Sequence, residues 1–314
     1  MIVNKYINDL KIEFALSNLD LFIFDKIGSR SEGGGYSKHY IGQKFLYRKI
    51  KKDTEEYLRE NYDAGKLPMF SSVEIEVINR CNGECPFCPV NKYDDPRKLK
   101  KMDTALFKKI IDELGKMNYR GRLALHSNNE PFLDDRIIEF AKYAREHVPK
   151  AYIYMYTNGT LLSLDKFNSI IDYLDKMIID NYDDNLQLSK NAKRIDMLCR
   201  ENGKLNRKVE IHVRKVHEVL STRGGQSPNN RKRKTIAMSC VLPYKQLIIR
   251  PDGKTSLCCN DSYGKNTMAD LCRMTLKEAW YSERYEMVRK ALRKGRKKVK
   301  LCQYCDTLAD VKTY

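Results

Sequence analysis

The chain has 314 residues, of which 42% are apolar and 32% charged, a balance that excludes a disordered or fibrous protein. This length suits one large core, or a barrel-sized core with a smaller appendage. The formal charge of +18 indicates either an acidic partner or a solvated, lysine-rich surface, and the second alternative is the more common one.

No apolar run is long enough to span a membrane, and charged residues before Leu21–Phe24 spoil the apolar region of a signal peptide. We therefore expect a cytoplasmic protein. Disulfides are rare in that reducing compartment, so the ten cysteines are better explained as metal ligands or catalytic thiols.

Residues 1–70 differ in pattern from the rest of the chain. Two helical stretches, at about 4–26 and 43–63, flank a glycine-rich segment at 28–35. No strand precedes that segment and no Lys-Ser/Thr pair follows it, so a flexible link is expected rather than a phosphate-binding loop. The pattern predicts a helical N-terminal extension.

From residue 71 onward, strands alternate with helices. Residues 73–77 alternate apolar and acidic, as a strand with two different faces does. Such alternation predicts an α/β fold with a parallel sheet, as in a full or partial barrel, and with the chemistry at the carboxyl ends of the strands. The further strands are expected at 123–126, 151–156, 176–180 and 209–215, and the helices at about 103–117, 135–148, 164–174 and 187–202.

The last third of the chain contains a loop, a hairpin and a helix. The loop at 221–235 ends in a basic run, and the segment 247–258 predicts a hairpin that turns at Asp252-Gly253. Thr275 and Glu278 form a capping box, which predicts a helix that runs to about residue 293.

Cys81, Cys85 and Cys88 follow the first strand of the alternating region. Three thiolates on a short loop can bind three irons of a cubane and leave the fourth iron open to a reactant. A structural zinc site would need a fourth ligand, and no other His or Cys lies nearby in the sequence.

This spacing, with the aromatic Phe87 before the last cysteine, resembles the radical SAM superfamily. The resemblance implies that the three cysteines hold a [4Fe–4S] cluster that binds S-adenosylmethionine (SAM). It also implies a partial (β/α)6 TIM-like barrel, which we assign to residues 71–235.

After the second strand, Asn128-Asn129-Glu130-Pro131 stands where the superfamily has Gly-Gly-Glu-Pro. The match implies that Glu130 and the adjoining backbone, including that of Asn129, hold the amino group of SAM. Asparagine tolerates the left-handed conformation better than most residues, so the turn can survive the loss of both glycines.

Three more residues resemble SAM-contacting positions of the superfamily. Asn158 belongs to a Thr-Asn-Gly segment after the third strand, and Asp180 and Asn181 end the fourth strand, where relatives place polar groups on the SAM ribose. A turn with helix-capping residues is the open alternative for Asp180 and Asn181.

Cys240, Cys258, Cys302 and Cys305 form a second set. Alone, they are equally consistent with a four-cysteine zinc site. Beside the first motif they resemble the SPASM/Twitch subgroup, and the number of cysteines implies the shorter Twitch form, with one auxiliary [4Fe–4S] cluster in residues 236–314. The spacing is similar to that of 2-deoxy-scyllo-inosamine dehydrogenase-type enzymes.

Two candidate catalytic residues come from the barrel and from the loop after it. In the fifth strand Glu210, His212 and Arg214 share one face, which would line the barrel lumen unless the strand lies at an edge, where they would be solvated. His212 is the candidate from that face. Arg223 resembles an arginine that lies near the reacting alcohol in the dehydrogenase.

Three functions remain open from the sequence. The first is a radical SAM oxidoreductase that forms a 5′-deoxyadenosyl radical and oxidises a carbohydrate-like or aminocyclitol alcohol, with the auxiliary cluster taking an electron. The second is a maturase of a ribosomally made peptide. The third is a metal-binding protein without catalytic activity.

The expected partners follow from these functions. They are a small-molecule or peptide substrate, which the basic charge allows to be anionic, and an electron donor of the flavodoxin or ferredoxin type. Nucleic acid is not expected, because the basic stretch 289–300 carries no aromatic residues for stacking on bases.

Overall fold

The computed structural model describes residues 19–20, 36–230 and 235–313, with side chains from residue 46 onward. The chain forms two compact units. Unit 1 comprises the described parts of Met1–Met69, Val219–Lys245 and Glu283–Tyr314, and unit 2 comprises Phe70–Glu218 and Gln246–Ser282. The predicted glycine-rich link and the basic run 231–234 lie outside the described residues.

Unit 2 is built on an eight-stranded sheet with the order β6-β5-β4-β3-β2-β7-β8-β9. The first six strands of that order are parallel, which confirms the predicted α/β barrel architecture. The five strands of the alternating region are β2 (Ser72–Ile75), β3 (Arg122–Ala124), β4 (Tyr152–Thr157), β5 (Lys176–Tyr182) and β6 (Val209–Arg214).

The sixth parallel strand, β7 (Gln246–Ile249), pairs with β2, so β6 is left at an edge of the sheet. The hairpin to β8 (Lys254–Ser256) turns as predicted, and Gly253 there has a φ of +80°. A Cβ at Gly253 would lie 2.7 Å from Cys272 Sγ, so no larger residue fits. β9 (Thr267–Asp270) completes the sheet.

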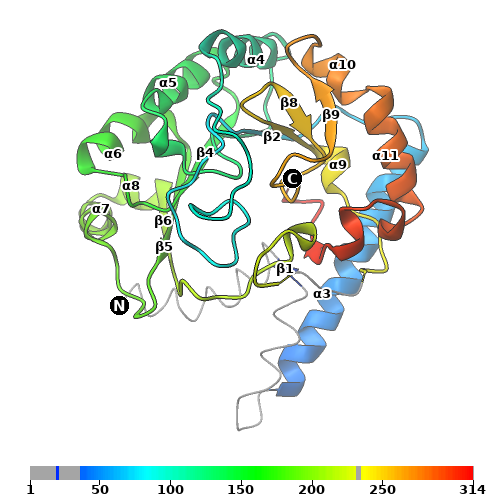
Figure 1. Ribbon diagram of the computed structural model, residues 1–314, viewed down its shortest axis with the longest axis horizontal. Helices are drawn as coiled ribbons and strands as arrows, with labels where there is room; N and C mark the ends of the chain where they lie inside the picture. Colours follow the sequence, from blue (N-terminus) through cyan, green and yellow to red (C-terminus); the bar gives the residue numbers. More distant parts are fainter. Residues whose placement is uncertain (1–18, 21–35, 231–234, 314) are drawn as a thin grey trace. The chain divides into compact units, whose positions relative to one another are not determined.

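The two faces of the sheet differ sharply in polarity. Odd-numbered residues such as Leu123, Ile153 and Ile179 are apolar and buried, and helices cover that side in an arc (Figure 1). Even-numbered residues on the facing side include Glu74 and His212, and they line the lumen of the barrel. The helices are α4 (Thr104–Lys116), α5 (Ile137–His147), α6 (Leu164–Ile170), α7 (Lys190–Glu201) and α8 (Gly203–Lys208).

The predicted start of α4 is confirmed in detail. Asp103 caps the helix by accepting hydrogen bonds from the N–H groups of Ala105 and Leu106, at 2.8 and 3.2 Å. The apolar face of α4 then packs Phe107 on Phe140 of α5, with stacked rings 4.1 Å apart.

Two predicted helices were wrong in their extent. The helix that opens at the Thr275–Glu278 capping box ends after α10 (Leu276–Trp280), because the Tyr281 N–H turns back to the carbonyls of Lys277 and Ala279, and α11 (Glu283–Arg293) begins separately. Within the helix predicted at 4–26, Leu19–Asp20 forms a strand, β1, whose backbone pairs with β10 (Thr307–Leu308).

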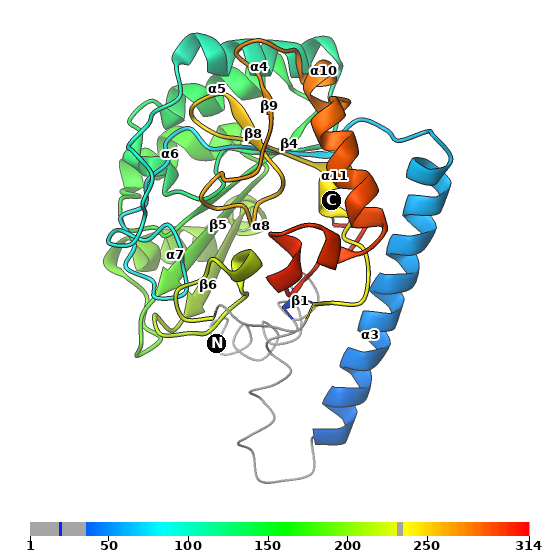
Figure 2. The same cartoon turned by 45° about the vertical axis from the view of Figure 1, so that its right-hand side comes forward.

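Unit 1 gathers three distant parts of the chain around one core. Ile50 of α3 (Tyr36–Tyr57) packs with Ile236, Met238 and Leu308. The helix predicted at 43–63 is confirmed as α3 and the π-helical turn Leu58–Asp63 that continues it. Figure 2 shows α11 beside α3, where Arg293 donates hydrogen bonds to Asp63 and Glu55. The other helices of this unit are α9 (Leu242–Lys245) and the 3-10 turns Arg223–Gly225, Arg296–Lys298 and Cys302–Tyr304.

Among the described residues, no helix combines the length and the apolar character that a membrane crossing requires. The functional division into 1–70, 71–235 and 236–314 stays a prediction, because the two units are defined by contacts and interleave in sequence.

Candidate iron–sulfur centres and barrel lumen

The three cysteines of the first set lie in the loop at the carboxyl end of β2. A Cβ placed on Gly83 would lie 3.3 Å from Cys81 Sγ and 3.7 Å from Cys85 Sγ, so these two sulfurs face one spot that the glycine leaves open. The Cys88 N–H donates to the Cys85 carbonyl at 3.0 Å and closes the turn between them. The loop is therefore a cradle with sulfur on its inner side.

The electrostatics of this cradle fit a cluster of iron. Burial raises the pKa of the Cys81 and Cys85 thiols to about 12, and the nearby sulfurs raise it as well. Three thiolates here need the positive charge of bound metal to balance them. The described residues hold no group of three His, Cys, Asp or Glu side chains with the geometry for a metal ion. A cubane differs from such a site, since it gives each thiolate an iron of its own.

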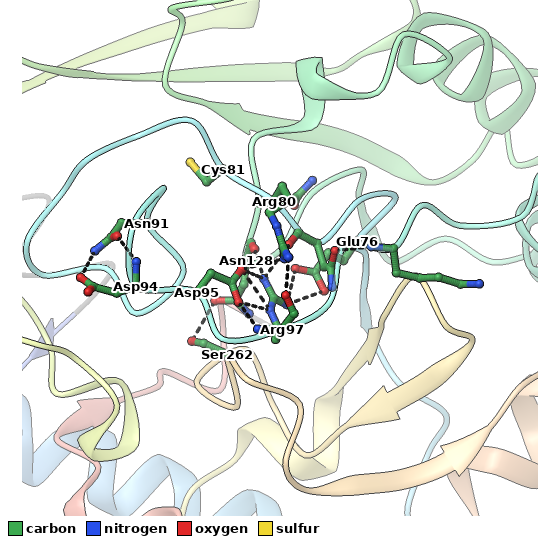
Figure 3. Close-up of polar contacts among 12 residues, drawn as sticks. Glu76, Arg80, Cys81, Asn91, Asp94, Asp95, Arg97, Asn128 and Ser262 are labelled. Carbon is green, nitrogen blue, oxygen red and sulfur yellow. Dashed lines mark hydrogen bonds and ion pairs between the residues drawn. The ribbon is translucent and has the colours of Figure 1, made fainter.

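Asn91 holds the cysteine loop in shape. Its Nδ2 donates to the Cys88 carbonyl at 3.0 Å and to Asp94 Oδ2 at 2.8 Å (Figure 3), while its Oδ1 accepts the N–H groups of Tyr93 and Asp94. This role could not be predicted from the sequence, because one Asn in a loop carries no distinctive pattern.

A buried ion network centred on Arg97 joins this loop to its neighbours (Figure 3). Arg97 Nη1 lies 3.0 Å from Glu76 Oε1, and its Nη2 lies 2.9 Å from Asp95 Oδ2. The same Nη2 donates to the Asn128 carbonyl at 3.2 Å. Burial raises the pKa of Glu76 to about 7 despite the arginine beside it. Arg97 therefore connects the end of β2, the segment after the cysteines and the turn at residue 128.

The carboxylate of Glu130 is largely used within the protein. It accepts hydrogen bonds from Phe132 N–H at 3.1 Å, Thr157 Oγ1 at 2.8 Å and Asn158 N–H at 2.7 Å. Glu130 thus fixes the turn after β3 to the end of β4. Direct contact between Glu130 and the SAM amino group stays a prediction.

The two asparagines that replace glycines keep ordinary backbone geometry. Neither Asn128 nor Asn129 has a positive φ, so the left-handed conformation expected for them is not used. Asn128 instead donates to the Cys259 carbonyl at 3.1 Å and accepts from Ser262 Oγ at 3.0 Å. Asn129 Nδ2 is buried and donates to no atom of the described residues, which suits an acceptor group on a bound ligand.

Asn158 and Phe87 connect the cysteine loop to the strand ends. Asn158 Nδ2 lies 2.9 Å from Asn82 Oδ1 and 3.8 Å from Cys81 Sγ, so one amide contacts the loop and a cysteine sulfur. The Phe87 ring packs 5.4 Å from that of Tyr182 at the end of β5. Contact of either side chain with a cofactor stays a prediction.

Asp180 and Asn181 point to opposite sides. Asp180 faces the lumen, and Asn181 donates to the Gln187 carbonyl and accepts from the Ser189 N–H, both at 2.8 Å. The contacts of Asn181 match the alternative that the sequence left open, a turn held before a helix. Asp180 is therefore the member of the pair that faces the lumen, where it contacts His212.

A charged cluster occupies the lumen between β5 and β6. His212 Nδ1 lies 3.0 Å from Asp180 Oδ1, and its Nε2 lies 2.7 Å from Glu210 Oε1. Lys176 pairs with Glu210 at 3.2 Å, and Arg214 Nε lies 3.7 Å from Asp180. Although β6 is an edge strand, His212 and Arg214 are only 8% and 7% exposed, so the solvated alternative is wrong for them.

A second histidine faces the lumen and carries no charge. His126 Nδ1 accepts the Tyr156 N–H at 3.1 Å, and burial lowers the pKa of His126 to about 3. The ring is therefore neutral, with its proton on Nε2. The rings of Tyr154 and Tyr156 flank it at 5.4 and 5.0 Å.

The second cysteine set is divided between the units. Cys240, Cys302 and Cys305 belong to unit 1 and Cys258 to unit 2, and each is 6% or 7% exposed. Within unit 1, the Cys240 sulfur is near enough to raise the pKa of Cys305, after the larger effect of burial. Buried thiols this close suit a shared metal centre.

Arg223 lies in a turn packed on the Cys302–Cys305 segment. Thr222 Oγ1 donates to the Tyr304 carbonyl at 2.6 Å, and a Cβ on Gly224 would lie 2.5 Å from Leu301 Cδ1. Arg223 itself has a φ of +47°, an uncommon conformation for a residue with a side chain. The structure thus brings Arg223 to the second cysteine set within unit 1.

Two family models match the chain in adjacent stretches. The model of the Radical SAM superfamily matches residues 75–222, and that of an iron–sulfur cluster-binding domain, SPASM, matches residues 240–306. The first match contains the Cys81 loop, and the second contains all four cysteines of the other set.

Similar proteins include a dehydrogenase and a peptide cyclase. The S-adenosyl-L-methionine-dependent 2-deoxy-scyllo-inosamine dehydrogenase of Niallia circulans is 27% identical over 243 residues, which is 77% of this chain and 94% of that enzyme. The PqqA peptide cyclase of Bradyrhizobium diazoefficiens is 28% identical over 102 residues, covering 32% of this chain and 25% of that one.

Two solved structures are similar to this chain in fold. BtrN in complex with AdoMet and 2-DOIA is 27% identical with a TM-score of 0.64, over 76% of this chain and 93% of that one. A histidine-tagged anSMEcpe with bound AdoMet has a TM-score of 0.52 at 15% identity, over 76% and 85%, and shows the shared fold.

Proposed function

Because the chain belongs to the radical SAM superfamily and carries a SPASM-type iron–sulfur domain, we propose that this enzyme oxidises an alcohol of an aminocyclitol or a similar carbohydrate-like substrate. The observation that carries the proposal is the similarity to the 2-deoxy-scyllo-inosamine dehydrogenase over 94% of that enzyme's length. Membership of this enzyme superfamily argues against a purely metal-binding role.

The chemistry of the bound groups follows from the superfamily. Radical SAM enzymes use a [4Fe–4S] cluster and SAM to produce a 5′-deoxyadenosyl radical, which removes a hydrogen atom from the substrate, and the SPASM domain holds auxiliary iron–sulfur chemistry that can accept an electron. Oxidation of an alcohol to a ketone is complete when the carbon has lost that hydrogen, one further electron has left and the hydroxyl proton has been released.

The ligand sets proposed for the two clusters come from the two cysteine patterns. Cys81, Cys85 and Cys88 would bind the SAM cluster, with the fourth iron open to SAM. Cys240, Cys258, Cys302 and Cys305 would bind the auxiliary cluster. The buried Nδ2 of Asn129 would donate a hydrogen bond to SAM. The residues that would line the SAM pocket are Phe87, Asn129, Glu130, Asn158 and Asp180.

His212 serves this reaction by position rather than as a base. Carboxylates face both of its ring nitrogens, so both nitrogens donate and the ring already holds its proton. It therefore orients Asp180 in the lumen and cannot take the hydroxyl proton. Arg223 remains a candidate for contact with the reacting alcohol, through its resemblance to the arginine of the dehydrogenase.

The partners proposed are a small-molecule substrate and an acidic electron donor of the flavodoxin or ferredoxin type. The formal charge of +18 favours association with an acidic protein or an anionic substrate. We place the enzyme in the cytoplasm, where its ten cysteines stay reduced.

The test is isotope transfer from a labelled substrate. Reconstituted enzyme is incubated without oxygen with SAM, a reductant and 2-deoxy-scyllo-inosamine, or related aminocyclitols, deuterated at the alcohol carbon. We expect deuterium in 5′-deoxyadenosine and one ketone per deoxyadenosine formed. The Cys302→Ala/Cys305→Ala variant is the matched control, and should still cleave SAM but form no ketone.

Two results together would contradict the proposal and favour peptide maturation. The first is deoxyadenosine without deuterium for every aminocyclitol, and the second is deuterium transfer from a labelled peptide. That alternative has the similarity to the PqqA peptide cyclase in its favour, but over a quarter of that enzyme only.

A further inference from the structure

Arg296 is a buried arginine beside the last cysteine of the second set. It follows α11, and its side chain is among the largest fully buried ones, at 2% exposure. Nη1 donates to the Cys305 carbonyl at 3.2 Å, and Nη2 donates to the Thr307 carbonyl at 2.8 Å. All three residues belong to unit 1.

This burial distinguishes Arg296 from the lysines around it, and in the same stretch Arg289 is buried as well, at 1% exposure. In the stretch 289–300, Lys294, Lys297 and Lys298 are exposed, as expected of a solvated surface. A guanidinium is rarely buried, because leaving water costs it much free energy. It also stays charged when buried, because an arginine side chain does not lose its proton in proteins. The fold therefore keeps a permanent positive charge next to Cys305.

We propose that Arg296 raises the reduction potential of the auxiliary cluster that binds through Cys305, and so makes that cluster a better electron acceptor. The inference rests on the proposed function, because it needs the auxiliary cluster. A cluster with four thiolates carries about −2 when oxidised and about −3 when reduced. A fixed positive charge in a poorly solvated site stabilises the second state more than the first.

The contacts of Arg296 hold its charge close to the cluster ligand, since both terminal nitrogens donate to carbonyls of the Cys305–Thr307 segment. When the cluster is bound, it would take one electron from the substrate radical and so be reduced by one electron, while the hydroxyl proton would go to solvent.

The experiment is a redox titration of the complete enzyme, followed by electron paramagnetic resonance. Arg296→Gln removes the charge and keeps hydrogen-bond donors. Lys297→Gln is the matched control, since it removes the same charge from the exposed neighbour. We expect Arg296→Gln to make reduction of the auxiliary cluster about tenfold less favourable, a fall of about 59 mV for one electron, with the SAM cluster unchanged. Lys297→Gln and Arg296→Lys should stay near the wild type.

A second variant covers a loss of the cluster in Arg296→Gln. Arg296→citrulline, introduced by ligating a synthetic C-terminal peptide at Cys272, removes the charge and keeps the shape of the side chain and one of its two terminal NH2 donors. Either variant with a full cluster and an unchanged auxiliary potential overturns the inference. A wild-type enzyme with about four irons and no second cluster signal would instead refute the proposed function.

Discussion

At the scale of single residues, His212 shows how the lumen fixes a charge state. The ring lies between Asp180 and Glu210, at 3.0 and 2.7 Å, while Lys176 and Arg214 balance the two carboxylates from outside. Burial alone would lower the pKa of His212, but hydrogen bonds to the two carboxylates outweigh it and raise the pKa to about 9. The hydrogen bond from His212 also lowers the pKa of Glu210 to about 2.

This charge state makes stability depend on pH. The pKa of a histidine is 6.5 without these contacts, so the protonated ring stabilises the fold fully below about pH 6.5, and that contribution is lost as the pH rises through about 9. We expect the thermal unfolding midpoint of His212→Asn to lie furthest below that of the wild type near pH 6 and to approach it above pH 9, in oxygen-free buffer.

His217→Asn is the control, because His217 also faces a carboxylate, at 2.8 Å from Asp184, but is exposed to solvent. Its effect should be small throughout. A difference between the wild type and His212→Asn that stays constant or grows with pH would contradict the assigned charge of His212.

At the scale of elements, side chains add to the backbone contacts between the loops at the carboxyl ends of the strands, such as the hydrogen bond from Glu130 N–H to the Arg80 carbonyl at 2.9 Å. Arg97 ties the end of β2 to the turn at Asn128, and Asn128 in turn contacts Cys259 and Ser262 after β8. Glu130 joins the same turn to β4. The turn Asn128–Pro131 is therefore held in place without the two glycines expected there from the superfamily.

Loss of the Arg97 charge should weaken this arrangement. Arg97→Met leaves Glu76, whose side chain is 2% exposed, without its ion-pair partner, while Asp95 keeps Arg80 at 3.4 Å. Loss of one partner of a buried ion pair costs about 3–5 kcal/mol. The urea midpoint of the oxygen-free enzyme should fall accordingly, and iron should be lost from the SAM cluster first.

The exposed Arg120 provides the control for Arg97→Met, since Arg120→Met removes the same charge at the surface. Adding Glu76→Gln to Arg97→Met should recover part of the stability, because it removes the buried carboxylate that has lost its partner. Equal midpoints for Arg97→Met and Arg120→Met would show that the network contributes nothing.

Local patterns determined how much of these elements could be predicted. The alternation of Glu210, His212 and Arg214 with apolar residues gave the correct inward face of β6, because side-chain direction in a strand depends only on position. The pairing of β7 with β2 could not be predicted, since it joins residues about 170 positions apart. The roles of Arg97 and Asn91 could not be predicted either, because each depends on a loop conformation that no local sequence pattern indicates.

At the scale of the whole molecule, each unit is completed by segments from later in the chain. Residues 246–282 complete the sheet of unit 2, while Arg293 closes unit 1 on Asp63, 230 positions away. The prediction of one helix from Thr275 to residue 293 was wrong, because its two halves belong to different units. The two cysteine sets could be recognised in the sequence because a cluster requires characteristic ligand spacings within short segments.

Bound clusters also change the charge of the whole molecule. One three-thiolate cluster contributes about −1 and one four-thiolate cluster about −2, so the formal +18 becomes about +15. The enzyme stays strongly basic, and part of that charge is internal, since Arg289 and Arg296 are buried.

The central claim is that one chain holds two clusters with separate tasks, and anaerobic reconstitution tests it most directly. We expect about eight irons per chain and cleavage of SAM to 5′-deoxyadenosine in the wild type. Cys81→Ala/Cys85→Ala/Cys88→Ala should keep about four irons and lose SAM cleavage, whereas Cys302→Ala/Cys305→Ala should keep about four irons and retain it. About four irons or fewer in the wild type, or zinc in place of iron, would contradict the account.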